Sequence, residues 1–302
     1  MTKSTRWFFA IVGLFALFAV GFMFLLFRFF SDVPAQQEIV AGGEGEQIAL
    51  VEITGIISGS RETVRQIKDY REDRSIRAVL LRIDSPGGGV VASQEIYEEV
   101  RKTRESGKPV VVSMGSVAAS GGYYIACGAN RIVANRGTLT GSIGVIAEFL
   151  QLSDALDKIG IDVKTIKSGR LKDAGSPTRR MTPVDQEYFQ GLIDDVHQQF
   201  VEVVERERSL SRSDVAELAD GRVFTGEHAA EIGLVDTLGT FEDAIAITAS
   251  LAGIEGEPSV VKERPRRIWW ERIFGEAVEE LAGIQRGLMD RPVLSFRFVG
   301  PS

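Results

Sequence analysis

The sequence has a single cysteine, Cys127, and only two histidines, His197 and His228, among its 302 residues. One cysteine excludes an internal disulfide and a cysteine-rich metal site. Neither histidine has a ligand-like neighbour at helical spacing, so we expect no metal and no cofactor. Basic residues are also in the minority, with 35 Lys and Arg against 42 Asp and Glu and a net charge of −7. This balance argues against nucleic acid as a partner, because nucleic-acid binders need a basic surface.

Charge is absent from the 21 residues between Trp7 and Phe27. As a helix rising ~1.5 Å per residue, this run spans ~32 Å, which is enough to cross a bilayer. Lys3 and Arg6 precede it, so the positive-inside rule places the N-terminus in the cytoplasm and the rest of the chain outside it. A cleaved signal peptide is the alternative, but its apolar region is usually only about 7–15 residues long. We therefore predict an uncleaved, single-pass anchor in the cell (inner) membrane.

The segments that follow the predicted anchor differ in amino-acid composition. Behind it comes a polar, glycine-rich stretch that reads as a flexible stalk. Beyond the stalk, aliphatic strands alternate with amphipathic helices, which predicts an α/β domain with a mostly parallel sheet. The expected parts are a cytoplasmic tail at 1–6, the anchor at 7–27, the stalk at 28–46, the folded domain at 47–254 and a C-terminal extension at 255–302.

Within the folded domain, strands are predicted from runs of β-branched and aliphatic residues, and helices from 3.6-residue periodicity. Thr182 followed by Pro183 marks the start of a long helix. The expected strands are 48–57, 78–83, 109–114, 131–134, 142–147 and 163–166, and the expected helices are 60–70, 90–104, 121–128, 154–159 and 182–210.

Three glycine-rich turns follow predicted strands, at 84–89, 118–123 and 140–144. In the second turn, small residues flank Ser120, as in a nucleophile elbow, and a helix starting at Gly121 would aim its N–H groups at the serine. The first turn offers flexible backbone N–H groups at Gly87 and Gly88, so the two turns could form an oxyanion hole. Each turn alone could also be no more than a tight loop. A phosphate cradle at the first turn is disfavoured because no Gly-Lys-Ser/Thr follows.

A serine nucleophile needs a base, and both histidines read better as surface or capping residues. Lysine is the alternative if its pKa falls from about 10.4 towards neutrality, which requires desolvation. The residues alone leave three candidates open, which are Lys164, Lys167 and Lys172. Cys127 reads as a small buried hydrophobe rather than a reactive thiol.

Four ordered motifs carry a family resemblance: DSPGG at 84–88, AASGGYYIA at 118–126, TGSIGV at 140–145 and SGxxKD at 168–173. With the anchor, they resemble the signal peptide peptidase A (SppA) family of membrane-anchored serine peptidases in its short, single-domain form. The resemblance covers roughly residues 47–254. It implies a crotonase-like (ClpP-like) fold, assembly into ring-shaped homo-oligomers, and degradation of signal peptides and other hydrophobic peptides at the membrane.

The resemblance also implies a role for individual residues. Ser120 would be the nucleophile and Lys172 the general base of a Ser/Lys dyad, with Ser142 orienting the lysine amine. The N–H groups of Gly121 and Gly88 would form the oxyanion hole. Because the loop around Lys172 has almost no aliphatic residues to bury it, we expect Lys172 to act on Ser120 of a neighbouring subunit. An acyl-CoA enzyme of the crotonase type and a catalytically silent scaffold remain alternatives.

Overall fold

The structure is a computed structural model that describes residues 7, 13–15, 17, 18, 20–23, 37–43, 45–263 and 294–298. Two units are distinguished, residues 1–38 with 263–267, and residues 39–262 with 268–302. In the first unit, the described residues of the apolar run are helical and exposed. No helix among the described residues is both long and apolar enough to span a bilayer. The predicted tail and most of the anchor and stalk lie outside the described residues, so the anchor stays a prediction.

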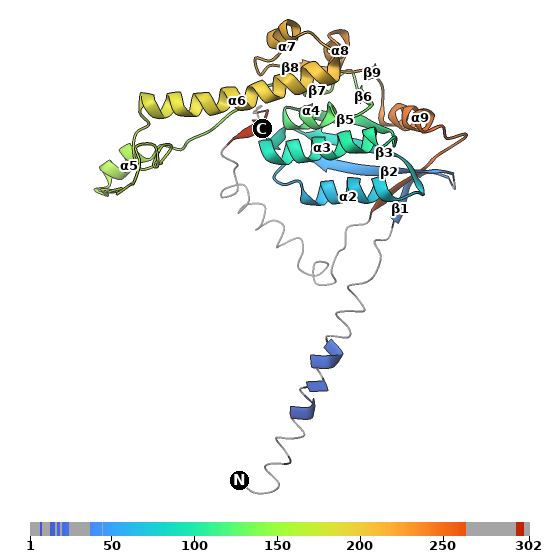
Figure 1. Ribbon diagram of the computed structural model, residues 1–302, viewed down its shortest axis with the longest axis horizontal. Coiled ribbons are helices and arrows are strands. Elements are labelled where there is room, and N and C mark those ends of the chain that lie inside the picture. The colour runs from blue at the N-terminus through green and yellow to red at the C-terminus, as the bar shows by residue number, and fades with distance from the viewer. Residues whose placement is uncertain are drawn as a thin grey trace. The chain divides into compact units, whose positions relative to one another are not determined.

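A mainly parallel sheet forms the centre of the second unit (Figure 1). The pairs from β10 through β2, β3 and β5 to β6 and β9 are all parallel, and β7 continues in parallel from the end of β5. The prediction of an α/β fold with a mostly parallel sheet is therefore confirmed. In sheet order, the strands are β1 (Gln37–Gly42), β10 (Ser259–Glu263), β2 (Gln47–Thr54), β3 (Ile76–Ser85), β5 (Val110–Ala119), β6 (Arg131–Ala134) and β9 (Thr237–Leu238), with β7 (Leu139–Gly141) between β5 and β8 (Val223–Thr225).

Helices cover both faces of this sheet because its central strands are apolar on both sides. In β3, Val79 and Leu81 pack beneath α2 (Arg61–Glu72) and α3 (Val90–Glu105), whereas Leu80 packs against α9 (Phe241–Ala252) on the opposite face. The alternation follows the two-residue period of a strand. The other helices are α4 (Gly121–Ala126), α5 (Ser153–Lys158), α6 (Pro183–Arg208), α7 (Arg212–Leu218) and α8 (Gly226–Glu231).

The long helix α6 begins where the sequence predicts. Thr182 accepts a hydrogen bond from the backbone N–H of Asp185, and the Asp185 carboxylate accepts one from the backbone N–H of Thr182. This reciprocal capping satisfies two of the free N–H groups at the helix start. The helix ends at Ser209, which is left-handed with φ of 52°.

Two predicted strands are wrong, and among the described residues seven strands were not predicted: β1, β4 (Gly87–Gly89), β7, β8, β9, β10 and β11 (Ser295–Arg297). Residues 142–147 are not a strand, because Gly141 and Ser142 both have positive φ angles, 76° and 50°, which turn the chain out of the sheet. Residues 163–166 are irregular and exposed, with no strand beside them to pair with among the described residues. Two of these, β4 and β11, pair antiparallel with each other, although the paired residues are at least 295 − 89 = 206 positions apart.

Tyr123 provides a test of how α4 is fixed to the body of the domain. Its side chain is fully buried and its hydroxyl donates to the Leu234 carbonyl at 3.0 Å. Tyr123→Phe should lower the free energy of unfolding by about 1 kcal/mol, because a buried acceptor loses its donor. Urea unfolding measures this. The control Tyr188→Phe, at an exposed position of α6, should stay within about 0.5 kcal/mol. Equal effects of the two changes would contradict this account.

Candidate active site

The three glycine-rich turns lie side by side because the strands that precede them pair in register. Ser85 at the end of β3 pairs with Ala118 of β5, and Ala118 pairs with Thr140 of β7. The Thr140 hydroxyl also donates to the Ala118 carbonyl at 2.7 Å. Since the strands are parallel, their carboxyl ends meet at one edge, which is where ligands of parallel sheets bind. The structure thus brings together all three turns that the sequence analysis singled out.

Ser120 occupies a strained turn between β5 and α4. Its φ and ψ angles are 53° and −114°, a conformation that costs an L-residue energy and must be held by its surroundings. Its N–H donates to the Gly141 carbonyl, and its carbonyl accepts from Tyr124, both at 2.8 Å. The side chain is 1% exposed, and Oγ has no hydrogen-bond partner in the described part of the chain. A strained strand-to-helix turn with an unengaged hydroxyl is the geometry of a nucleophile elbow.

The amides of Gly88 and Gly121 border one small space next to Ser120. A Cβ added to Gly121 would lie 3.2 Å from the Gly88 nitrogen, and a Cβ added to Gly87 would lie 2.7 Å from the Gly121 nitrogen. Gly87 also has φ of 97°, which a residue with a side chain rarely adopts. Position 87 therefore requires glycine for two reasons, the lack of space for a Cβ and the positive φ. Two N–H groups so close together can bind one oxygen atom that carries negative charge.

Two serines that the sequence analysis passed over support these turns. Ser85 Oγ donates to the Gly55 carbonyl at 2.6 Å and accepts from the Gly87 N–H at 3.1 Å. Ser93 Oγ donates to the Gly89 carbonyl at 3.0 Å. Both side chains are fully buried. Ser85 belongs to the DSPGG motif, so its position in the motif was the available signal, whereas nothing in the sequence marked Ser93.

Ser142 lies on the same edge of the sheet. Its side chain is 6% exposed, and its N–H donates to the Arg222 carbonyl at 2.8 Å. The residue before it, Gly141, accepts the hydrogen bond from Ser120. The third turn is therefore tied directly to the second. Within the described residues, no hydrogen bond joins the Ser142 side chain to Ser120 or Lys172.

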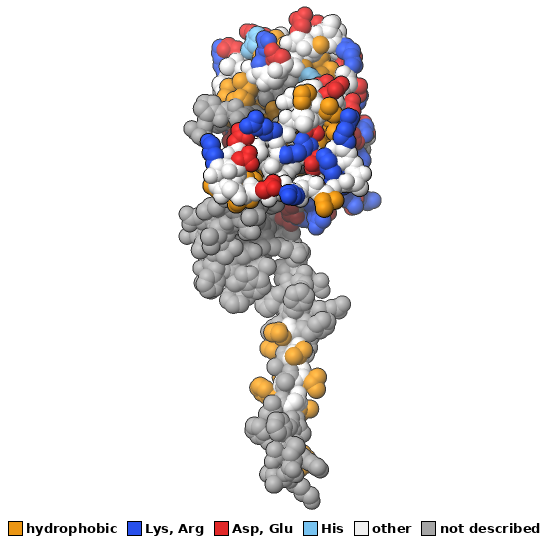
Figure 2. Space-filling view, turned by 90° about the vertical axis from the view of Figure 1, so that its left-hand side faces the viewer, with side chains coloured by type: hydrophobic (Ala, Val, Ile, Leu, Met, Phe, Trp, Pro, Cys, Tyr) orange, Lys and Arg blue, Asp and Glu red, His pale blue; other side chains and the backbone are white. Residues whose placement is uncertain are grey.

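Lys172 lies on an arm that projects from the sheet, formed by α5, the loop after it and the first turns of α6 (Figure 1). Its side chain is exposed, and no hydrogen bond or ion pair joins it to Ser120 among the described residues. The single chain therefore does not assemble the predicted dyad. Figure 2 looks onto this side of the molecule and shows acidic, basic and apolar side chains interspersed.

The three candidate lysines differ in their surroundings. Lys167 forms an ion pair with Asp173 at 2.6 Å, and Lys164 lies 3.9 Å from Asp162. Lys172 has no ion-pair partner among the described residues.

An ion-pair network orders the loop on both sides of Lys172. Asp173 accepts hydrogen bonds from Arg179 at 3.0 Å and Lys167 at 2.6 Å, and Arg179 also binds Asp185 at the start of α6. The hydrogen bonds from Arg179 and then Lys167 lower the pKa of Asp173 to about 2. Asp173 is therefore ionised throughout the physiological range, and the network that positions its neighbour Lys172 is intact there.

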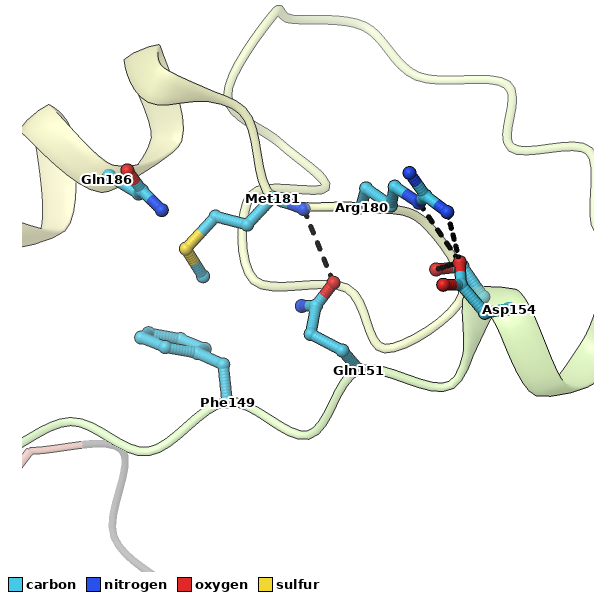
Figure 3. A pocket seen from close by; sticks show the side chains of 7 residues that line it. Phe149, Gln151, Asp154, Arg180, Met181 and Gln186 are labelled. Carbon is cyan, nitrogen blue, oxygen red and sulfur yellow. Dashed lines mark hydrogen bonds and ion pairs between the residues drawn. The ribbon is translucent and has the colours of Figure 1, made fainter.

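A shallow pocket marks where the arm folds on itself (Figure 3). Arg180 pairs with Asp154 of α5 at 2.9 Å, and the Met181 N–H donates to Gln151 at 3.3 Å. The Met181 side chain points towards Phe149, whose ring packs on Phe189 with centroids 4.3 Å apart. None of the residues lining this pocket belongs to the glycine turns. The pocket contributes to the shape of the arm rather than to the chemistry at Ser120.

The remaining candidate groups do not enter the site. His228 is exposed and contacts Glu231 at 3.2 Å, and His197 is half-buried on α6. Neither is hydrogen-bonded to Ser120 in the described part of the chain. Over the same residues, no cluster of His, Cys, Asp or Glu could hold a metal ion. Cys127 is buried, and its burial raises the pKa of the thiol to about 12.

Comparison with known proteins gives consistent matches. The model of peptidase family S49 matches residues 102–255. A Synechocystis protein provisionally named a protease is 49% identical over 70% of this chain and 76% of its own length. An Enterococcus faecium protein provisionally named signal peptide peptidase SppA is 31% identical over 89% of this chain and 82% of its own. The chloroplastic serine protease SPPA of Arabidopsis thaliana is 38% identical over 76% of this chain and 36% of its own.

The buried thiol of Cys127 should be inert in the folded protein. With a pKa of about 12, only about one thiol in 10⁴ is ionised at pH 8, and the thiolate is the reactive form. Iodoacetamide at pH 8 should leave the native protein unlabelled over an hour and label it fully in guanidinium, as read by intact mass. Rapid labelling of the native protein would show that Cys127 is accessible and ionised, contrary to this description.

Proposed function

The chain belongs to peptidase family S49 and is a serine protease of the SppA kind, and from this premise we propose that it is a membrane-anchored endopeptidase with a Ser120/Lys172 dyad. The observation that carries the proposal is the turn at Ser120. There, a strained and buried serine with an unengaged hydroxyl lies beside the amides of Gly88 and Gly121. These are the nucleophile and the oxyanion donors that acyl transfer needs.

The proposed reaction has two stages. Lys172, in its neutral form, accepts the proton of Ser120 as Oγ attacks the carbonyl carbon of the substrate peptide bond. The N–H groups of Gly88 and Gly121 stabilise the negative oxygen of the tetrahedral intermediate. The lysine then gives its proton to the leaving amine. The C–N bond breaks, and the acyl group stays on Ser120 as an acyl-enzyme. A water molecule, deprotonated by the same amine, releases the second product and restores Ser120. Ser142 would orient the amine.

The base is proposed to come from a neighbouring subunit of a ring-shaped homo-oligomer. In one chain, Lys172 is exposed on the projecting arm, and among the described residues no hydrogen bond or ion pair joins it to Ser120. The arm also presents an unusual number of exposed apolar side chains, which favours burial against another copy. They are Leu150, Leu152, Ile159, Ile161, Val163 and Ile166, the last of them fully exposed.

The proposed substrates are cleaved signal peptides and other hydrophobic peptides, with the catalytic domain on the outer side of the membrane. The substrate class is supported by the Enterococcus relative's name and by the predicted anchor. Binding of CoA by the purified protein would favour the crotonase-type alternative instead. Failure of Ser120 to react with a fluorophosphonate probe in the assembled protein would favour a silent scaffold.

Loss of either dyad member should abolish hydrolysis. Ser120→Ala and Lys172→Ala should each reduce kcat/KM for a synthetic signal peptide by at least about 10³-fold, because residues that act as a unit fail together. Product formation is followed by mass spectrometry, and circular dichroism checks the fold. The control is the double variant His197→Ala with His228→Ala, which should keep its activity. If the Lys172→Ala variant stays active while the double histidine variant loses its activity, the base is a histidine.

The shared site can be tested by mixing two inactive subunits. Ser120→Ala and Lys172→Ala chains, co-expressed with different affinity tags, should regain activity when rings containing both are isolated. Random mixing pairs an intact Ser120 with an intact Lys172 at about a quarter of the interfaces, so activity should recover to about that fraction of the wild type. Silent mixed rings would mean that each chain completes its own dyad.

A further inference from the structure

Strand β5 has a bulge at residues 115–117, shortly before the nucleophile turn. Met114 pairs with Ile83 of β3, and the next residue of β5 in register with that strand is Ala118, which pairs with Ser85. Over this step β5 advances by four residues while β3 advances by only two. Surplus residues in one strand bend it and increase its twist. The bulge therefore sets the direction in which the end of β5 approaches the site.

The bulge coincides with the change of partner on the other side of β5. The strand pairs with β6 up to Ser113 and with β7 from Val117 onward. Between these two regions, the Gly115 carbonyl accepts a hydrogen bond from the buried hydroxyl of Thr138 at 2.7 Å. The pairing with β7 is the one that holds Ser120, through its N–H. The bulge is thus part of the arrangement that fixes the nucleophile.

Two side chains of β3 bind the main chain at the ends of the bulge. Arg82 donates to the Met114 carbonyl at 3.0 Å, and Asp84 Oδ1 accepts from the Val117 N–H at 3.0 Å. Residues two apart on a strand share a face, so both side chains act from the same side of the sheet. A Cβ added to Gly115 would lie 2.6 Å from Asp84 Cγ. The carboxylate therefore fills the space beside the bulge as well as accepting its hydrogen bond.

Asp84 and Ser85 are consecutive residues that support different turns. Their side chains point to opposite faces of β3, as the two-residue period of a strand requires. The Ser85 hydroxyl holds the first glycine turn by accepting from Gly87. The Asp84 carboxylate holds the strand that leads into the second turn by accepting from Val117. One short piece of β3 thus sets both the oxyanion donors and the nucleophile.

From these contacts we propose that Asp84 is a positioning residue, whose carboxylate fixes the bulge and so holds Ser120 in its strained conformation. It acts through the Val117 N–H, three residues before the nucleophile. The inference rests on the proposed peptidase function, because it assigns Asp84 a part in the same site. The role requires an acceptor oxygen at this position and does not require a charge, so an amide oxygen serves equally well.

Two substitutions at position 84 separate the acceptor from the charge. In full-length protein, Asp84→Ala should lower kcat for a synthetic signal peptide at least about tenfold and leave KM within about threefold, because a misplaced reacting group slows chemistry more than binding. Asp84→Asn keeps an oxygen that accepts from Val117 and should retain at least about a third of the wild-type kcat. Its pH profile should match that of the wild type.

Asn130→Ala is the matched control, because it removes the same kind of bond from the same strand. Asn130 Oδ1 accepts from the Val110 N–H at 2.8 Å, at the end of β5 away from Ser120. This change should lower the melting temperature but leave kcat within about twofold. Thermal unfolding shows whether each variant folds. If Asp84→Ala does not fold, Asp84→Ser replaces it, since its hydroxyl stops one atom short of the carboxylate oxygen.

Amide hydrogen exchange reports on the bulge without any hydrolysis. The N–H groups of Val117 and Ser120 should exchange at least about tenfold faster in Asp84→Ala than in the wild type, because the bond that holds the bulge is lost. In Asp84→Asn and Asn130→Ala, both groups should exchange at close to the wild-type rate. Mass spectrometry with fragmentation to single residues measures these rates.

The outcomes separate this inference from the proposed function. If folded Asp84→Ala keeps the wild-type kcat and exchange rates, strand pairing alone fixes Ser120 and the inference is wrong. If Asp84→Asn is as slow as Asp84→Ala, or its pH profile shifts, Asp84 acts through its charge and the inference is again wrong. If the wild type cleaves no hydrophobic peptide, the peptidase proposal fails, and the exchange rates alone decide whether Asp84 positions Ser120.

Discussion

The backbone pairing at the end of β5 is the constraint on which the site depends. The first part of β5 pairs with β6, and its last residues pair instead with β7, while β3 stays on the other side throughout. This change of partner brings the Gly141 carbonyl to the N–H of Ser120. The hydrogen bond, together with the first turn of α4, holds the serine in a conformation that it would not adopt alone. A shift in the register of β7 would remove the acceptor and allow Ser120 to relax.

The glycine turns were predictable because runs of glycine and proline are rare inside strands and helices and mark turns. A run such as DSPGG after an aliphatic strand marks a turn at the carboxyl end of a parallel sheet. The three turns did meet there. The strand prediction at residues 142–147 was wrong for a physical reason. Their apolar content suits a strand, but the positive φ of Ser142 cannot be read from composition. The strand β11 could not be predicted either, because it forms by pairing Phe296 with Gly88, which lies in a distant part of the sequence.

The position of Lys172 shows a different limit of sequence reasoning. The family motif identifies it, whereas in one chain no hydrogen bond or ion pair joins it to Ser120 among the described residues. Yet neither the motif nor the single chain supplies the dry surroundings that a neutral amine needs. The ion pairs of Asp173 with Lys167 and Arg179 shape the loop without covering the lysine. In the proposed mechanism desolvation comes from a neighbouring copy, and the exposed apolar side chains of the arm are the surface proposed to contact it.

The features that make the oxyanion space also bring other main chain close to it. Because Gly87 and Gly88 have no side chains, neighbouring segments approach them closely, and β4 pairs with β11 on one side and is hydrogen-bonded to Ile57 on the other. A Cβ at Gly87 would lie 2.0 Å from the Phe296 carbonyl oxygen, and one at Gly88 would lie 2.1 Å from the Ile57 carbonyl oxygen. A side chain at either position would therefore push one of these neighbours away and widen the space that the amides of Gly88 and Gly121 border.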